Sequence, residues 1–132
     1  MGSASVEAAQ RAIEDCAGMR FGVNLFYPQR ELTAAEHAAA ESLASEENAV
    51  LSDVSLTFGW HEKLSAALNG GAAVLWSMFG AFTTEEVERI HAAGAEAWTT
   101  VTTPEEAAAA TARGVDVLCV QGPEAGGHRG VW

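Results

Sequence analysis

The fold is indicated by the stretch from Val74 to Gln121, VLWSMFGAFTTEEVERIHAAGAEAWTTVTTPEEAAAATARGVDVLCVQ, in which one pattern occurs repeatedly. Short apolar runs start near positions 74, 97 and 117, and a helical segment with a capped start and a closing glycine separates each run from the next. Strands that alternate with helices form a parallel sheet, because parallel strands need a crossover connection. The pattern therefore predicts an α/β fold, either an open doubly wound sheet or a (β/α)8 barrel.

The first half of the chain extends this alternation. Apolar residues at helical spacing or at strand spacing, together with capping residues and glycines, predict each element. We expect a helix over residues 5–16, a strand over 21–26, an alanine-rich helix over 33–45, coil over 46–57 and a helix over 60–69. Four strands and their helices are thus expected in the whole chain.

The composition excludes two classes of partner. The chain has 132 residues and a formal net charge of −11, from 18 acidic and 7 basic residues. Such a charge repels nucleic acids and anionic membrane surfaces. No apolar run approaches the roughly 20 residues that cross a bilayer, and the first residues lack a basic region followed by an apolar one. We therefore expect a single domain located in the cytoplasm.

The cysteines and three of the histidines do not indicate a metal centre. Cys16 and Cys119 are far apart and have no second ligand at metal-binding spacing, so we predict two buried, reduced thiols. His37, His61 and His91 fall in predicted helices without suitably spaced partners, and we expect them to be surface or packing residues. The sequence therefore predicts no metal site.

The segment from Gln121 to Gly130, QGPEAGGHRG, follows the apolar run Val115–Val120, which we predict to be a buried strand that ends at Gln121. Both candidate folds bind ligands at the carboxyl ends of their strands. Asn24 is the polar exception in its own strand and needs either an internal partner or a ligand. The glycines match neither a dinucleotide fingerprint nor a P-loop. Local chemistry leaves two interpretations open, a ligand-binding loop or a glycine-rich turn with an incidental histidine.

Three segments of the chain, residues 21–26, 100–107 and 121–130, occur in an order and at separations that resemble the nitronate monooxygenase family, formerly called 2-nitropropane dioxygenases. The resemblance covers nearly the whole chain, and the last of the three motifs is the specific one. Members of that family are FMN-dependent (β/α)8 barrels that oxidise alkyl nitronates with O2 and release a carbonyl compound and nitrite. A barrel of this type needs roughly 250 residues. The resemblance thus implies a single partial barrel domain of the FMN-binding type over residues 1–132, about half of a TIM-type barrel, corresponding roughly to strands three to six.

The resemblance also implies roles for individual residues. It places Asn24, Gln121, Gly126 and Gly127 against FMN and makes His128 the catalytic residue, and it implies no metal. An amide can hydrogen-bond the polar edge of a flavin, glycine allows close approach of the backbone, and a histidine can remove a carbon-bound proton. The implied partners are a small alkyl nitronate and O2.

Two alternatives to a nitronate monooxygenase stay open at this point. One is a related flavin-dependent enoyl-thioester reductase, and the other is an inactive, truncated half-barrel fragment. Half a barrel would leave sheet edges open, so self-association through those edges is also expected.

Overall fold

The computed structural model describes residues 2–49 and 56–132, so the central part of the coil expected over 46–57 lies outside the described residues. Helices and strands alternate along most of the chain, as the sequence predicts, and their bounds agree with the expected ones to within one or two residues. The elements are α1 (Val6–Asp15), β1 (Gly22–Phe26), α2 (Ala34–Glu46), α3 (Trp60–Asn69), β2 (Val74–Met78), α4 (Thr84–Ala92), β3 (Glu96–Val101), α5 (Pro104–Ala112) and β4 (Val117–Val120).

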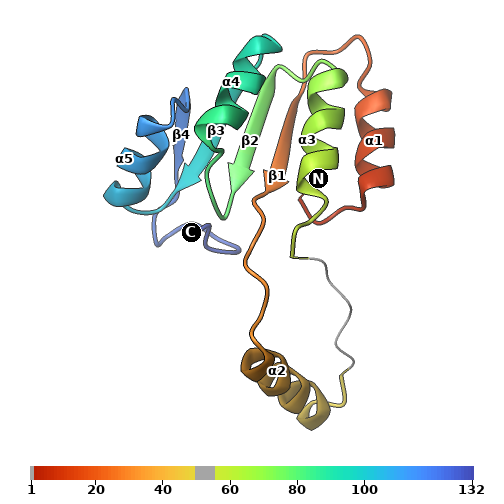
Figure 1. Ribbon diagram of the computed structural model, residues 1–132, viewed down its shortest axis with the longest axis vertical. Helices are drawn as coiled ribbons and strands as arrows, with labels where there is room; N and C mark the ends of the chain where they lie inside the picture. Colours follow the sequence, from red (N-terminus) through yellow and green to blue (C-terminus); the bar gives the residue numbers. More distant parts are fainter. Residues whose placement is uncertain (1, 50–55) are drawn as a thin grey trace.

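The four strands form one parallel sheet in the order β1-β2-β3-β4 (Figure 1). Neighbours in sequence are therefore neighbours in the sheet, with a helix in each crossover. The register places Asn24 beside Trp76 and Trp76 beside Trp98, and it places Thr100 beside Cys119. All four strands consequently end at the same edge of the sheet, where the glycine-rich segment follows β4.

The two faces of the sheet differ in burial. Side chains that alternate along the strands and face the helices are at most 2% exposed: Val23, Leu25, Leu75, Ser77, Ala97, Thr99 and Val101. Val23, Leu25, Leu75 and Ala97 form the main core with residues from α1, α3 and α4, and Val101 packs with Ala81 and Ala110 in a second cluster. On the opposite face Asn24 and Trp98 are half-buried and Trp76 is 36% exposed. Helices that cover one face only are typical of a barrel wall, so the partial barrel is confirmed and the doubly wound alternative is wrong.

Local side-chain chemistry starts three of the helices. In each, a threonine accepts a hydrogen bond from the third helical N–H, and the glutamate at that position accepts one from the backbone of the threonine. These capping boxes are Thr33–Glu36 in α2, Thr83–Glu86 in α4 and Thr103–Glu106 in α5. Glu86 has a second role, since its carboxylate also accepts a bond of 2.6 Å from the indole Nε1 of Trp60 and so joins α4 to α3.

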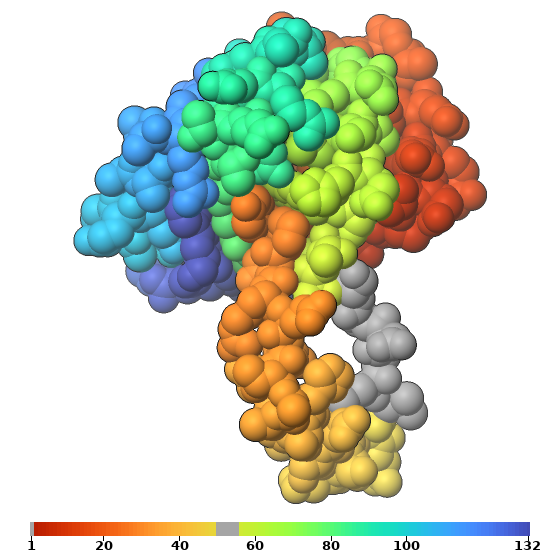
Figure 2. All heavy atoms as spheres, in the orientation of Figure 1, coloured from red at the N-terminus to blue at the C-terminus, as the bar shows by residue number. Residues whose placement is uncertain are grey.

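Helix α2 stands away from the rest of the molecule on an extended arm (Figures 1 and 2). None of its residues is buried, and Leu43 is 63% exposed. The backbone N–H of Gln29, before the arm, donates to the carbonyl of Leu56, after it, over 2.9 Å. The chain therefore leaves the body at Gln29 and returns to it at Leu56, and these two residues lie side by side.

Two expectations about burial are wrong. The last strand is β4, Val117–Val120, shorter than the expected 115–121, and it is not buried: three of its residues are half-buried and Val120 is 80% exposed. Cys16 and Cys119 are free thiols, but each is only half-buried. Burial of a strand needs neighbours on its edges and faces, and in the described sheet β4 pairs with β3 alone. Cys16 lies at the exposed C-cap of α1.

Candidate active site

The glycine-rich segment forms a loop that begins where β4 ends. The backbone N–H of Gln121 still bonds to the carbonyl of Val101, and a turn follows in which Ala125 N–H donates to Gly122 C=O over 3.2 Å. Gly127 has φ of 83°, a conformation that side chains with a Cβ resist. A Cβ built on Gly126 or on Gly127 would meet no atom within 4 Å. Open space therefore lies beside the backbone at the two glycines that the sequence predicts to contact a cofactor.

The side chain of Gln121 crosses this loop. Its Nε2 donates to the carbonyl of His128 over 3.0 Å, and its Oε1 accepts from the N–H of Gly130 over 2.6 Å. The structure thus brings two of the predicted site residues, Gln121 and His128, into direct contact. The imidazole of His128 is exposed and makes no hydrogen bond within the part of the chain that the structure describes.

The end of the loop is attached to the sheet and to α5. Gly130 is buried, and a Cβ built on it would lie 3.0 Å from Cγ2 of Thr100. Trp132 donates from its indole Nε1 to the carbonyl of Thr100 over 3.0 Å and from its backbone N–H to Glu106 Oε1 over 3.1 Å. The guanidinium of Arg113 lies 5.8 Å from the centroid of the Trp132 ring. These contacts fix the segment that follows His128.

Glu106 is ionised in this arrangement. Burial acts to raise the pKa of its carboxyl, but hydrogen bonds from Thr102, Trp132 and Thr103 outweigh burial and lower the pKa. The donors are the backbone N–H groups of all three residues and the hydroxyl of Thr102. The carboxylate is therefore the acceptor that joins the start of α5 to the end of the loop.

Asn24 lies on the open face of the sheet. Its Nδ2 donates to the backbone carbonyl of Trp76 over 3.3 Å, and the indole Nε1 of Trp76 donates to Thr100 Oγ1 over 2.9 Å. Since Thr100 also packs against Gly130, a chain of contacts connects Asn24 to the loop. Among the described residues the structure does not place Asn24 in direct contact with His128 or with Gln121.

Other reactive groups contribute little to this site. Burial raises the pKa of the Cys119 thiol, so this side chain is a protonated thiol rather than a nucleophilic thiolate at neutral pH. Within residues 2–49 and 56–132, no three His, Cys, Asp or Glu side chains gather closely enough to hold a metal ion. Over the same residues, no helix has the length and apolar character that crossing a membrane requires.

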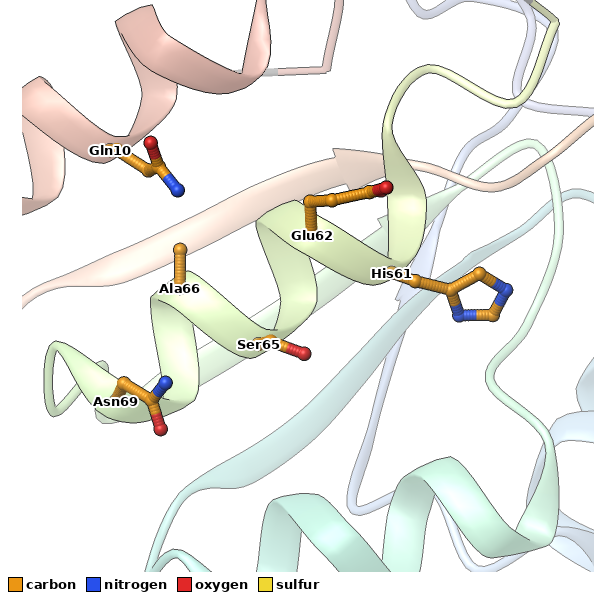
Figure 3. A pocket seen from close by; sticks show the side chains of 6 residues that line it. All are labelled: Gln10, His61, Glu62, Ser65, Ala66 and Asn69. Carbon is orange, nitrogen blue, oxygen red and sulfur yellow. The ribbon is translucent and has the colours of Figure 1, made fainter.

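A shallow depression of about 440 Å³ lies elsewhere, between α1 and α3 (Figure 3). In the close-up, Gln10 extends from α1, and the imidazole of His61 points away from it. The lining residues are Gln10, His61, Glu62, Ser65, Ala66 and Asn69. None of them was predicted to bind a cofactor or substrate, and the depression lies between helices rather than at the strand ends.

A sequence model of the nitronate monooxygenase family matches residues 2–132. The chain belongs to the nitronate monooxygenase family. A curated nitronate monooxygenase from Pseudomonas aeruginosa is 48% identical over 54 residues, which are 41% of this chain and 15% of that protein. The solved structure of a nitroalkane oxidase from Streptomyces ansochromogenes superposes with a TM-score of 0.82 at 35% identity, over 98% of this chain and 40% of that one. These relatives are oxidoreductases.

A more distant structure agrees with the fold alone. A FabK variant from Thermotoga maritima superposes with a TM-score of 0.62 at 17% identity, over 96% of this chain and 34% of the FabK chain.

This member of the nitronate monooxygenase family spans less than half the length of the nitronate monooxygenase and the nitroalkane oxidase that it matches.

Sequence reasoning did not single out three residues that shape the site, Trp76, Thr100 and Trp132. The signal for the first two was present, since the alternation of a strand places every second residue on the face that carries Asn24. That signal becomes visible only once the register between strands is known. No local pattern distinguishes Trp132, because its role depends on contacts with β3 and α5.

Proposed function

We propose that this chain supplies part of the active site of an FMN-dependent nitronate monooxygenase, which oxidises alkyl nitronates with O2 to a carbonyl compound and nitrite. One observation carries the proposal. His128 presents an exposed imidazole on a glycine-rich loop that is attached at both ends, at the carboxyl edge of a parallel sheet. Ligands bind at this edge in folds of this class, and membership of the family supports the assignment.

The residues of this edge, together with Asn24 on the open face of the sheet, fit a flavin. Asn24 uses one N–H of its amide for the carbonyl of Trp76, which leaves its second N–H and its oxygen for a ligand. Gln121 similarly retains one N–H and one lone pair beyond its two bonds to the loop. The open space beside Gly126 and Gly127 allows a planar group to approach the backbone. We assign these four residues to FMN, which supplies the redox chemistry when bound.

His128 has the chemistry that the substrate requires. The protonated ring can donate a hydrogen bond to an oxygen of the anionic nitronate, and the neutral ring can accept the proton of a parent nitroalkane, whose removal from the carbon beside the nitro group gives the nitronate. The exposed ring faces no competing partner among the described residues. We propose His128 as the catalytic residue on these grounds.

The proposal extends to the organisation of the protein. Residues 1–132 act as one partial barrel domain of the FMN-binding type in the cytoplasm, with a small nitronate and O2 as partners. The outer edge of β4, with Val120 at 80% exposure, supports association through the sheet edge. Light scattering on the purified chain tests this part, and a monomer at all concentrations would contradict it.

Two measurements test the central proposal. The purified chain, mixed with FMN and desalted, should keep the absorption spectrum of a bound flavin, and it should consume O2 when an alkyl nitronate is added. His128→Ala should lower the rate of O2 uptake by about a hundredfold or more. His37→Ala, on the exposed helix α2, is the matched control and should leave the rate unchanged. Equal rates for His128→Ala and the wild type would refute the role of His128.

A further inference from the structure

We propose that Gln121 is a positioning residue: its side-chain amide fixes the backbone of His128 and so determines the position of the imidazole. This inference rests on the proposed catalytic function of His128. The amide holds the backbone immediately before and after Arg129, through the carbonyl of His128 and the N–H of Gly130. The loop segment that carries the imidazole is thus bonded to the residue that directly follows β4.

The polarity of the two bonds fixes the orientation of the amide. A backbone carbonyl can only accept and a backbone N–H can only donate, so Nε2 must face His128 and Oε1 must face Gly130. A reversed amide would oppose two donors at one end and two acceptors at the other. Asparagine carries the same amide but is one methylene shorter, and the ionised side chain of glutamate offers acceptors alone.

The loop needs such a bond because its own backbone is permissive. Gly122, Gly126 and Gly127 lie between Gln121 and His128, and glycine has the largest conformational freedom to lose on ordering. The turn that closes at Ala125 orders only the first part of this segment. Without the amide bridge, the path from β4 to His128 would pass through two adjacent glycines, beside which an added Cβ would meet no atom within 4 Å.

The other end of the segment is already fixed. Gly130 packs on Thr100, and Trp132 is bonded to Thr100 and to Glu106. His128 therefore stands between an anchor on β3 and α5 and the amide of Gln121. A residue whose backbone is held on both sides carries its side chain from a fixed point, and catalysis depends steeply on such placement.

Contact between Gln121 and a flavin is compatible with this role. The amide has two N–H donors and two lone pairs, and the loop uses one of each. A bound flavin could take the second N–H without breaking either bond to the loop. The two functions are separable by experiment, because loss of a cofactor contact weakens FMN binding whereas misplacement of His128 lowers turnover.

Two substitutions distinguish the contributions of the two hydrogen bonds that the Gln121 side chain makes with the loop. Gln121→Glu keeps an oxygen for the N–H of Gly130 but has no donor for the carbonyl of His128, and Gln121→Met keeps the length of the side chain and removes both bonds. Glu124→Gln, an exposed change on the same loop, is the matched control. Because Gln121 lies at the half-exposed end of a strand, all three variants should fold, which circular dichroism verifies.

The first readout needs neither FMN nor activity. Amide hydrogen exchange at Gly130, followed by NMR, should be about tenfold faster in Gln121→Met than in the wild type and unchanged in Gln121→Glu and Glu124→Gln. The ring resonances of His128 should shift in both Gln121 variants and not in the control. Unchanged exchange at Gly130 in Gln121→Met, or unchanged His128 resonances in both variants, would overturn the inference.

The second readout uses the protein loaded with FMN. At saturating FMN, kcat for nitronate-dependent O2 uptake should fall about tenfold or more in both Gln121 variants, and because saturation offsets any rise in the Kd for FMN, this fall reports the position of His128. A raised Kd with an unchanged kcat would assign Gln121 to the cofactor alone and overturn the positioning role. A wild-type chain with no nitronate-dependent uptake would reject the proposed function, and the exchange and ring-resonance results would still decide whether Gln121 sets the place of His128.

Discussion

Replacing Glu106 by glutamine should remove one of the hydrogen bonds that attach the end of the glycine-rich loop to α5. The carboxylate accepts from Thr102 and Thr103 through Oε2 and from the backbone N–H of Trp132 through Oε1. Glutamine has one oxygen only. The side chain should turn this oxygen toward Thr102 and Thr103, where three donors converge, so that its NH2 faces the N–H of Trp132. The bond to Trp132 is then lost, and the capping bonds lose their charge.

The expected decrease in the free energy of unfolding follows from the kind of hydrogen bond that is lost. A hydrogen bond to a charged group contributes about 1.5–3 kcal/mol, so Glu106→Gln should lower the free energy of unfolding by about 2 kcal/mol. With a urea m-value of about 2 kcal/mol per molar, the unfolding midpoint should fall by about 1 M. Glu105→Gln, an exposed neighbour in the same first helical turn, is the control and should shift the midpoint by no more than about 0.2 M.

The pH dependence tests the same reasoning. The pKa of Glu106 is lower in the folded chain than its ordinary value of 4.5. Its contribution is therefore fully present above that value and is lost as the pH falls through the lowered pKa. The difference in unfolding midpoint between the wild type and Glu106→Gln should shrink as the pH falls below 4.5. Equal midpoints for Glu106→Gln and Glu105→Gln at neutral pH would refute the argument.

Two further predictions concern stability and use urea unfolding. Gly80→Ala should lower the free energy of unfolding by about 1–3 kcal/mol, because the added Cβ would overlap the ring of Tyr27. Gly126→Ala adds a Cβ into open space and should change this free energy by less than about 0.5 kcal/mol. Equal losses of stability in the two variants would contradict this. Asp116→Ala should lower the free energy of unfolding by about 1–2 kcal/mol, because its Oδ2 accepts from a backbone N–H of β3 over 2.7 Å. His91→Ala removes only an exposed hydrogen bond of 2.8 Å to the same carboxylate and should lower it by less than about 1 kcal/mol. Equal losses for the two variants would contradict this, since they would show that the bond to His91 accounts for the whole contribution of Asp116.

Local signals in the sequence were sufficient for the helix starts and for the order of the elements. The capping boxes at Thr83–Glu86 and Thr103–Glu106 involve residues three apart, and the glycines at 94 and 114 have the positive φ that a helix end requires. Each of these features depends on a few neighbouring residues. They could therefore be read before any tertiary contact was known.

Local signals of this kind do not predict which residues are buried or which face of the sheet is open. Trp76 and Trp98 are large and apolar, so their strands gave no alternation between apolar and polar residues. Lys63 shows the converse, since it is 2% exposed although lysine is rarely buried, and its ammonium donates to the carbonyl of Gly2. In each case burial depends on what another segment places nearby.

The candidate site was predictable as a stretch of residues but not as a geometry. The order of glycines around His128 is specific enough for the family to be recognised from the sequence. The bonds from Gln121 to His128 and Gly130 were not predicted, although the residues are close in sequence. A glutamine side chain has many conformations, and only the completed loop shows which backbone groups it reaches.

The hydrogen bond between Gln29 and Leu56 brings the two ends of the arm that carries α2 together, as at the base of an insertion. Because the two ends of the arm meet, a shorter connection could join them without displacing β1 or α3. Closing a loop half as long costs about 0.6 kcal/mol less entropy, so shortening the arm is favourable for chain entropy, and none of its described residues belongs to the core. A change in the length of this segment should therefore leave the barrel wall in place, because the wall meets it only near Gln29 and Leu56 among the described residues.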